Sequence, residues 1–440
     1  MTNTHPNPDL ASKVDTYMQA LVTLDRFSGA ILIARAGEVL MSAGYNLANR
    51  EHGVPNTPQT KFRLGSVTKQ FTAMAILILQ HQGKLRVQDP ISALLPGCPD
   101  AWEPVTVHHL LNHTSGMPEH TDRISWQTTG RSPLTVQGVV DLFKDLPLDF
   151  QPGENHQYSN SGYILLGQII EQVSGMPYET FVRKQILDPL GMENTGYDRS
   201  DRVLEHRATG YDLRDGAYVN AGFLDMSLPH AAGALYSTVE DLLLWDQSFY
   251  TETFVPQSSL QTMTMLSPFL ANYGYGIAMG SQFGRQLVGH GGGIHGFLTK
   301  LDRYPDEKVC IAVLSNLTST NPHEVARTLA AILFGEEYEI PEVHTPARVE
   351  SDILESYAGE YQFAPGIVVT IKAGDQQLTA AVSGGSRAEL LPESETQFFR
   401  KSGDDESKED RVTFFRDVAG EVTHLVLKQQ DAEERANKIG

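Results

Sequence analysis

The pattern of apolar and polar positions predicts strands at both ends of a long first region. Residues 28–46 hold two apolar, alternating runs that meet at Ala36 and Gly37, which is typical of two paired strands. A helix over 8–24 precedes them. From residue 273 onward, short runs return in YGYGIAM, RQLVGHGG, GFLTKLDRYP and KVCIAVLSN. Strands at both ends indicate one antiparallel sheet that closes around the segment between them.

That middle segment has a helical pattern. Prolines and glycines, as in QPGEN and VSGMP, separate its apolar-periodic stretches. We expect an α+β fold, with an antiparallel sheet flanked by helices, a mostly α-helical subdomain and a site in the cleft between sheet and insert. The predicted helices cover residues 68–82, 106–112, 135–144, 160–173 and 178–187.

A different pattern follows near residue 336. The segment 336–350, which contains EEYEIPEVHTPAR, is polar with two prolines and predicts a linker. After it, about seven short strands with turns at intervals of about ten residues predict a small β-barrel or sandwich. The charged run SGDDESKED, 402–410, fits a solvated hairpin loop. We therefore expect domains over 1–335 and 351–440.

Composition and charge narrow the classes of protein. Of 440 residues, 40% are hydrophobic and 20% charged, which is typical of a globular chain. The net charge of −20 argues against nucleic acid as a partner. The longest apolar run, AMAILIL at 73–79, is far shorter than the roughly 20 residues of a membrane span. The isolated Cys98 and Cys310 argue against a disulfide framework, a zinc site or a thiol active site.

The start of the chain, MTNTHPNPDL, has neither a basic segment nor an apolar segment of a signal peptide. We expect a cytoplasmic location, or a periplasmic or secreted one if a leader was removed.

Ser66 and Lys69 in LGSVTKQF are the first candidates for chemistry. Residues three apart share one face of a helix, so the hydroxyl and the amine can touch. A lysine becomes a base when burial lowers its pKa, and Lys69 leads directly into the apolar QFTAMAILIL. The alternative is a serine cap with an unrelated lysine that reaches solvent.

Tyr158 and Asn160 form a second candidate pair. They follow QPGENHQ and precede an apolar-periodic helix, so both can project from a turn into a cleft, where a tyrosine could carry a proton to a leaving group. The same Tyr-x-Asn pattern recurs at Tyr218 and Asn220. We interpret that second copy as part of a strand, with the phenol at the surface.

The stretch LVGHGGGIHGF supplies a third element around His290. Consecutive glycines let a strand approach a ligand closely, so Gly292 and Gly293 could pair with substrate and donate a backbone N–H. Two other features have simpler explanations. His109 and His113 have a spacing that could bind a metal, but no third ligand is evident, and we expect none. Ser115 in HTSGM is expected to be a turn residue.

Together the three elements resemble the motifs of the serine β-lactamase and penicillin-binding-protein superfamily, in its class C and esterase-like branch. The order is Ser66-Val-Thr-Lys69, Tyr158-Ser-Asn160 and His290-Gly-Gly292. The stretches VTVHHLLNHTSGMP, ILDPLGMENTGY and AAGALYSTVEDLLLW are also similar to recurring stretches of that family, and the likeness covers roughly residues 15 to 335.

This resemblance implies a role for each residue. Ser66 would be the acylated nucleophile and Lys69 its general base. Tyr158 would protonate the leaving group, and Asn160 would bind the substrate amide or hold Lys69. The backbone N–H groups of Ser66 and Gly293 would form the oxyanion hole. No cofactor and no metal are expected.

His290 departs from the lysine that β-lactamases and many D,D-peptidases of the family carry there. Histidine is mostly neutral near pH 7, so it provides no permanent cation for a substrate carboxylate. A histidine here is similar to what esterases and D-amino-acid-specific peptidases or amidases of the family carry. This resemblance implies a small-molecule or short-peptide substrate with an ester or a D-amino-acid peptide or amide bond. The alternatives are a penicillin-binding D,D-peptidase or weak β-lactamase, and a non-catalytic binding or scaffold protein with the same fold.

The C-terminal strands, which open with YAGEYQF, resemble the lipocalin-like domain that follows the hydrolase domain in some peptidases of this group. In such proteins the barrel is associated with assembly or with access to the cleft. A homo-oligomer is therefore among the expected partners.

Overall fold

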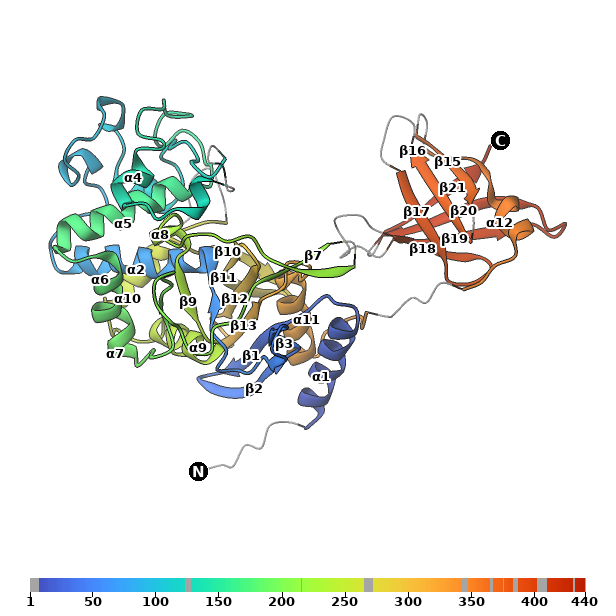
Figure 1. Cartoon of the computed structure of the whole chain (residues 1–440), viewed down its shortest axis with the longest axis horizontal. Coiled ribbons are helices and arrows are strands. Elements are labelled where there is room, and N and C mark those ends of the chain that lie inside the picture. Colours follow the sequence, from blue (N-terminus) through green and yellow to red (C-terminus); the bar gives the residue numbers. More distant parts are fainter. Residues whose placement is uncertain are drawn as a thin grey trace. The chain divides into compact units, whose positions relative to one another are not determined.

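The computed structural model describes residues 8–439, apart from 123–124, 126–127, 215, 265–271, 342–346, 365–366, 375, 383–386, 402–409 and 430–431. The chain divides into two compact units, Met1–Pro341 and Glu342–Gly440 (Figure 1). The middle of the predicted linker and nearly all of the predicted charged loop, 402–409, lie outside the described residues.

A six-stranded antiparallel sheet in the order β10-β11-β12-β13-β1-β2 forms the centre of the first unit. The two regions that the sequence predicts as strands meet in it, because β1 pairs with β13 from Gly29↔Ser315 to Arg35↔Val309. This confirms the predicted α+β class. The strand bounds are β1 (Gly29–Arg35), β2 (Glu38–Tyr45), β10 (Ala278–Gln282), β11 (Arg285–Ile294), β12 (Phe297–Tyr304) and β13 (Val309–Ser315).

The predicted strand at 273–279 is wrong over most of its length, because β10 begins only at Ala278. Gly276 has a positive φ of 69°, and a Cβ there would lie 2.6 Å from the backbone oxygen of Lys69. Tyr273 and Tyr275 are both buried. This segment therefore packs as a turn against α2 instead of alternating across a sheet.

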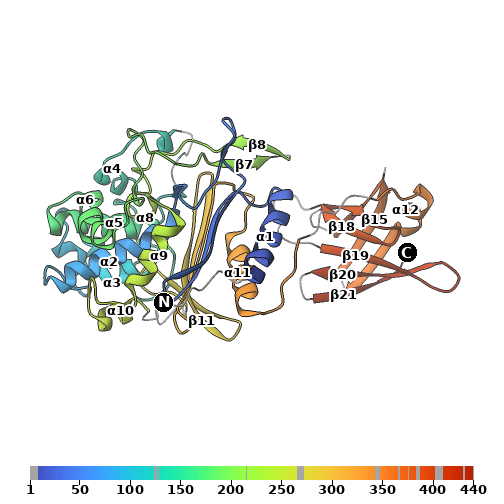
Figure 2. The same cartoon turned by 90° about the horizontal axis from the view of Figure 1, so that it is seen from below.

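Both faces of the sheet are covered, so the neighbouring strands β13 and β1 are mostly apolar on each side. Along β1, Ala30 and Leu32 belong to the core shared with α2 and α5, whereas Ile31 and Ile33 belong to the core shared with α1 and α11. Figure 2 shows α1 and α11 on one side of the sheet and the helical segment on the other. The first of these cores also positions the candidate site, because the first turns of α2 and α5 carry candidate residues.

The helices of the middle segment agree in part with the prediction. Those at 68–82, 106–112 and 160–173 are confirmed within one or two residues, whereas 178–187 is divided: α6 ends at Val182, a wider helical turn covers Arg183–Leu187, and α7 follows. The helix at 135–144 is shorter than predicted. The bounds are α1 (Pro8–Thr23), α2 (Thr68–His81), α3 (Val107–Leu111), α4 (Val136–Val140), α5 (Asn160–Ser174), α6 (Tyr178–Val182), α7 (Asp188–Leu190), α8 (His230–Gly233), α9 (Val239–Ser248), α10 (Gln257–Met263) and α11 (Pro322–Phe334).

Short strands complete the first unit. β9 joins β5 and β6 in a small sheet, while β3 pairs with β4 and β7 pairs with β8. Their bounds are β3 (Leu47–Asn49), β4 (Val54–Pro55), β5 (Phe62–Arg63), β6 (Gly196–Tyr197), β7 (Tyr211–Arg214), β8 (Ala217–Asn220) and β9 (Leu235–Ser237). No helix in the described part of the chain is both long and apolar enough to cross a membrane.

The second unit is a closed barrel of eight described strands, one more than the seven or so predicted. β14 closes it by pairing with β21, at Tyr361↔Lys438 and Gln362↔Asn437. Its core combines aliphatic and aromatic side chains, and within it Tyr357 stacks on Phe414 at 4.2 Å between ring centroids. The bounds are α12 (Ser351–Tyr357), β14 (Gly359–Ala364), β15 (Ile367–Gly374), β16 (Gln377–Val382), β17 (Arg387–Pro392), β18 (Gln397–Lys401), β19 (Asp410–Arg416), β20 (Val422–Gln429) and β21 (Ala432–Lys438).

Candidate active site

Ser66 lies in a single 3-10 turn, Gly65–Val67, immediately before α2, and not in the α-helix itself. Gly65 has a φ of 52°, and a Cβ there would lie 2.9 Å from the backbone nitrogen of Gly293 in β11. A Cβ on Gly292 would lie 2.0 Å from the carbonyl oxygen of Leu64. Only glycines allow this contact, so the turn that carries Ser66 lies directly against the strand that carries Gly293.

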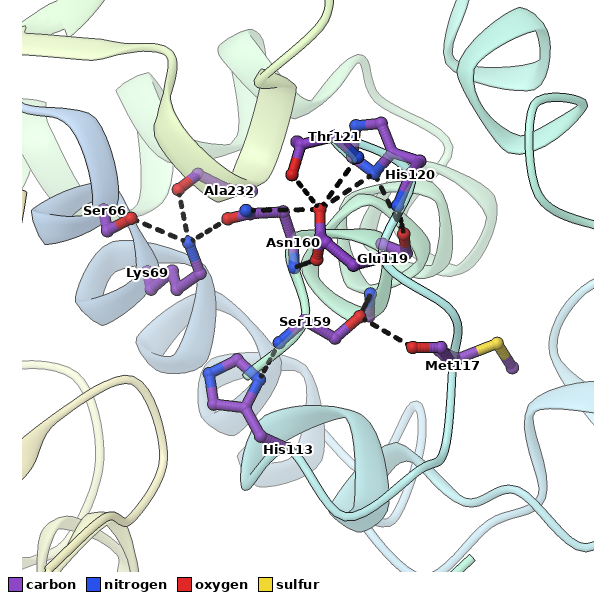
Figure 3. A network of polar contacts seen from close by, with 12 residues as sticks. Ser66, Lys69, His113, Met117, Glu119, His120, Thr121, Ser159, Asn160 and Ala232 are labelled. Atoms are coloured by element: carbon purple, nitrogen blue, oxygen red, sulfur yellow. Dashed lines mark hydrogen bonds and ion pairs between the residues drawn. The ribbon is translucent and has the colours of Figure 1, made fainter. Parts of the chain in front are cut away.

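The amine of Lys69 is held by three neutral oxygens. Its Nζ lies 3.1 Å from Ser66 Oγ, 2.8 Å from Asn160 Oδ1 and 2.9 Å from the carbonyl oxygen of Ala232 (Figure 3). A neutral amine has two N–H donors and one lone pair. The oxygens of Asn160 and Ala232 can take both donors, which leaves the lone pair free to accept the Ser66 proton.

Burial favours that neutral form. Lys69 is fully buried, and this lowers the pKa of its amine from 10.5 to about 7. The carboxylate of Glu119 acts in the opposite direction on the same pKa. The Lys69 nitrogen also lies 4.8 Å from the centre of the Tyr158 ring. The sequence-based expectation of a desolvated lysine is confirmed, and the cap-and-solvent alternative is wrong.

Tyr158 and Asn160 flank the start of α5. Between them Ser159 caps the helix, with its Oγ accepting the N–H of Gly162 at 3.2 Å. Tyr158 is 37% exposed, but protein atoms crowd its phenol and raise its pKa above 10, while a hydrogen bond with Ser66 acts the other way. The turn therefore places a protonated phenol and an amide next to Ser66 and Lys69.

Glu119 is the residue of this group that the sequence reasoning missed. Its carboxylate accepts the backbone N–H of Asn160 at 2.5 Å, and its other oxygen lies 3.4 Å from Asn160 Nδ2 (Figure 3). It comes from a loop in MPEH that carries no repeating pattern, so no signal in a single sequence marks it. The carbonyl of Ala232, in α8, is equally invisible to a search for side chains.

His290 is fixed by its own neighbours and makes no described hydrogen bond to Ser66 or Lys69. Its Nε2 lies 2.8 Å from the hydroxyl of Tyr273, and its Nδ1 lies 2.5 Å from the carbonyl oxygen of Gly291. Burial, helped by the charge of Lys69, lowers the pKa of His290 to about 3. The ring is therefore neutral at ordinary pH.

A cavity of about 620 Å³ opens beside Ser66. Ser66, Asn160 and Gly293 line one part of it, and His290 is not among the described residues at its wall. Its remaining wall includes the apolar Leu224, Leu228, Pro229, Ile294 and Leu298, and also the ion pair of Asp212 and Arg214. The cavity can accept an apolar group attached to a carbonyl at Ser66.

His109, His113 and Ser115, the other candidates from the sequence, lie in a helix cap and in turns. His109 Nδ1 accepts the backbone N–H of Thr106 in a helix cap, and His113 lies beyond the end of α3. The described residues contain no cluster of metal ligands. Ser115 Oγ accepts the N–H of Met117, as expected of a turn residue.

Tyr218 lies in β8, as predicted, but the expectation of a surface phenol is wrong. Its hydroxyl is 2.5 Å from Asp25 Oδ1, and the guanidinium of Arg50 covers its ring at 3.1 Å. Tyr218 of the second Tyr-x-Asn copy therefore joins the β7-β8 hairpin to the segment between α1 and β1.

Comparison with known proteins agrees with this geometry. Residues 11–336 match the family described as Beta-lactamase, and residues 344–438 match a domain of unknown function, DUF3471. The chain therefore belongs to the β-lactamase family, within the serine hydrolases related to penicillin-binding proteins. The closed barrel fits the lipocalin-like character predicted for the second domain.

Three relatives illustrate the range of this family. The chain is 31% identical to Penicillin-binding protein 4* of Bacillus subtilis (strain 168), covering 96% of this chain and 97% of that protein. It is similar to the octameric penicillin-binding protein homologue from Pyrococcus abyssi, with 28% identity, a TM-score of 0.69 and coverage of 97% and 99%. A D-stereospecific amidohydrolase from Streptomyces sp. is 27% identical, with a TM-score of 0.63 and coverage of 72% and 99%.

Proposed function

We propose that this serine hydrolase cleaves ester or D-amino-acid amide bonds through a covalent acyl-Ser66 intermediate. The observation that carries the proposal is the contact of 3.1 Å between Ser66 Oγ and a buried Lys69 amine whose pKa is about 7. Such an amine is neutral in a large fraction of molecules at pH 7, so it can act as a general base.

The reaction follows from the donors and acceptors around Ser66. Its Oγ attacks the substrate carbonyl while its proton passes to Lys69 Nζ. The backbone N–H groups of Ser66 and Gly293 stabilise the oxyanion. Tyr158 gives its proton to the leaving group and is reprotonated from Lys69. Water then attacks the acyl-enzyme by the reverse proton path, releasing the acid and free Ser66.

The cavity and His290 support this choice of substrate. Apolar walls fit an apolar acyl group. A neutral His290 offers no cation to the carboxylate that penicillins and cell-wall peptides carry, and the Arg214 guanidinium at the cavity wall is already paired with Asp212 at 2.9 Å. The amidohydrolase relative, named as D-stereospecific, adds support for a D-amino-acid amide.

A penicillin-binding peptidase or weak β-lactamase is the second candidate. It is favoured by the 31% identity, over 96% of the chain, to a protein named Penicillin-binding protein 4*. A non-catalytic binding protein is the third, and it would have no use for an activated serine.

Intact-mass measurement after exposure to a fluorophosphonate, and separately to a penicillin, tests the proposal. We expect a phosphonate adduct in the wild type and in Ser132→Ala, an exposed-serine control, and none in Ser66→Ala. A lasting penicilloyl adduct would favour the second candidate. Folded wild-type protein without any adduct would favour the third and contradict the proposal.

We also propose that the chain forms a homo-oligomer, because the Pyrococcus abyssi homologue is described as octameric. Light scattering of the full chain should give a mass that is a multiple of 48.5 kDa. A single 48.5 kDa species at micromolar concentration would contradict this.

A further inference from the structure

The loop that follows α3 is joined to the start of α5 by a series of hydrogen bonds. Gln157 N–H donates to the carbonyl of His113 at 3.0 Å, Ser159 Oγ to the carbonyl of Met117 at 3.2 Å, and His120 N–H to Ser161 Oγ at 3.0 Å. These contacts fix the backbone on either side of Asn160. None of them reaches the amide of Asn160, which is the group that touches Lys69.

Among the described contacts of this loop, only those of Glu119 reach the side-chain amide of Asn160. Its carboxylate faces four donors: Asn160 N at 2.5 Å, Asn160 Nδ2 at 3.4 Å, Thr121 N at 3.1 Å and Thr121 Oγ1 at 2.7 Å. Its side chain is only 11% exposed. Because the Asn160 N–H is at the positive end of α5, the helix also favours a carboxylate in this place.

This contact determines which end of the Asn160 amide faces Lys69. The two ends have nearly the same shape, so an asparagine without partners can occupy either orientation. Glu119 accepts from Nδ2 and thereby turns Oδ1 toward Lys69 Nζ, at 2.8 Å. In the opposite orientation Nδ2 would face the amine, and Lys69 could use its lone pair there instead of on Ser66.

We propose that Glu119 is a positioning residue for the acyl-transfer reaction, holding the Asn160 amide so that the lone pair of Lys69 points to Ser66. This inference rests on the proposed function. Glu119 does not touch Ser66 in any described contact, so it acts through Asn160 and Lys69.

Glu119 could instead bind a positively charged substrate group, but its surroundings favour positioning. Four protein donors already approach its two oxygens, and little of its side chain is exposed. A contact with substrate would also affect KM, whereas an effect on Lys69 should appear in kcat and in its pH dependence.

Several charged groups determine that pH dependence. Glu119 raises the pKa of Lys69 and opposes the effect of burial. His120, on the same loop, has Nδ1 at 3.6 Å from Glu119 and at 2.9 Å from Ser161 Oγ, and burial lowers its pKa. Burial also lowers the pKa values of His113 and His290, so both rings favour the neutral form. Removing the charge of Glu119 should therefore lower the pKa of Lys69.

The test compares Glu119→Gln, Glu119→Asp and the exposed control Glu103→Gln on a p-nitrophenyl ester, with melting curves for each. We expect Glu119→Gln to lose about 10- to 100-fold in kcat with KM nearly unchanged, because the substitution removes hydrogen bonds to a charged group. The rise of kcat on the acidic side of its pH profile, called the acidic limb below, should move to lower pH in this variant. Glu119→Asp, which keeps the carboxylate, should recover part of kcat and the wild-type limb.

Three results would overturn the inference: an unchanged kcat in Glu119→Gln, a change confined to KM, or a lower kcat with the wild-type pH profile. If Glu119→Gln fails to fold, Glu119→Asp decides. A partial loss of kcat with KM nearly unchanged would support positioning by the carboxylate, whereas an unchanged kcat or a change confined to KM would oppose it. Failure of the proposed function is distinct, since then Ser66→Ala would keep the esterase activity.

Discussion

A buried lysine lies on each side of the central sheet, Lys69 in α2 and Lys300 in β12, and the two differ in their partners. Lys69, on the helical side, is bonded to three neutral oxygens. Lys300 lies opposite Val313, which packs on the α1 and α11 side, and it pairs with Asp302 at 3.0 Å. Only 8% of Lys300 and 2% of Asp302 are exposed.

This difference indicates what turns a buried lysine into a base. Removal from water disfavours a charged amine, and a carboxylate at contact distance opposes that effect. Lys300 has such a partner in Asp302. Lys69 has only neutral contacts, so burial prevails and lowers its pKa to about 7. The partner, together with burial, determines the role.

Lys69→Met should give the largest effect on activity. Without a base for the Ser66 proton, acylation should slow by about 10³-fold, measured as the rate of fluorophosphonate labelling. Lys84→Ala, which removes an exposed lysine, serves as the control and should label like the wild type. If the labelling rate of Lys69→Met were within a few-fold of the wild-type rate, Lys69 would not be the base, and the comparison with Lys300 would lose its meaning.

Lys300→Met should act on stability and leave labelling nearly unchanged. The substitution strands the buried Asp302 carboxylate and should cost about 3 to 5 kcal/mol of unfolding free energy, measured by urea denaturation. If the unfolding free energy stays the same while labelling falls, Lys300 rather than Lys69 would be the functional lysine.

Asn160→Asp should place a carboxylate against Lys69, as Asp302 lies against Lys300. A carboxylate in contact with the amine raises its pKa by about one unit or more, so the neutral fraction of Lys69 and the activity at pH 7 should fall about fivefold or more. Repulsion from Glu119 should add to this loss. The activity should recover at higher pH, where Lys69 is again neutral; a loss that is equal at every pH would instead indicate structural damage.

The double variant Lys300→Met/Asp302→Leu should have the smallest effect. Replacing a whole buried pair by apolar side chains of similar size is often neutral, so the unfolding free energy should lie within about 1 to 2 kcal/mol of the wild type. Thermal and urea unfolding measure it. A loss as large as that of Lys300→Met alone would mean that the pair itself stabilises the sheet.

The sequence was sufficient to predict the elements that follow a local pattern. The apolar alternation of 28–46 and the apolar run after Lys69 correspond to β1, β2 and α2. The order of the three motifs indicated the family, and the structure brings Ser66, Lys69 and Asn160 into hydrogen-bond contact. Local periodicity and motif order thus contain most of the fold and the centre of the site.

The features that the sequence did not predict depend on contacts between segments that are distant along the chain. The turn at 273–277 follows from a close approach of Gly276 to α2, which no local pattern reveals. Glu119 and the carbonyl of Ala232 reach the site only through the tertiary fold. Tyr218 differs from Tyr158 because Asp25 and Arg50 lie next to it, so identical motifs acquire different roles from their surroundings.

The pH dependence of the fluorophosphonate labelling rate of wild-type protein tests the central claim most directly. In the proposed mechanism the neutral form of Lys69 is the reactive one, so the rate should rise with pH through a midpoint near 7 and level off above it. His290, with a pKa of about 3, should add no step between pH 5 and 9. A midpoint near the ordinary lysine value of 10.5, or a rate independent of pH, would contradict the assignment of Lys69 as the base.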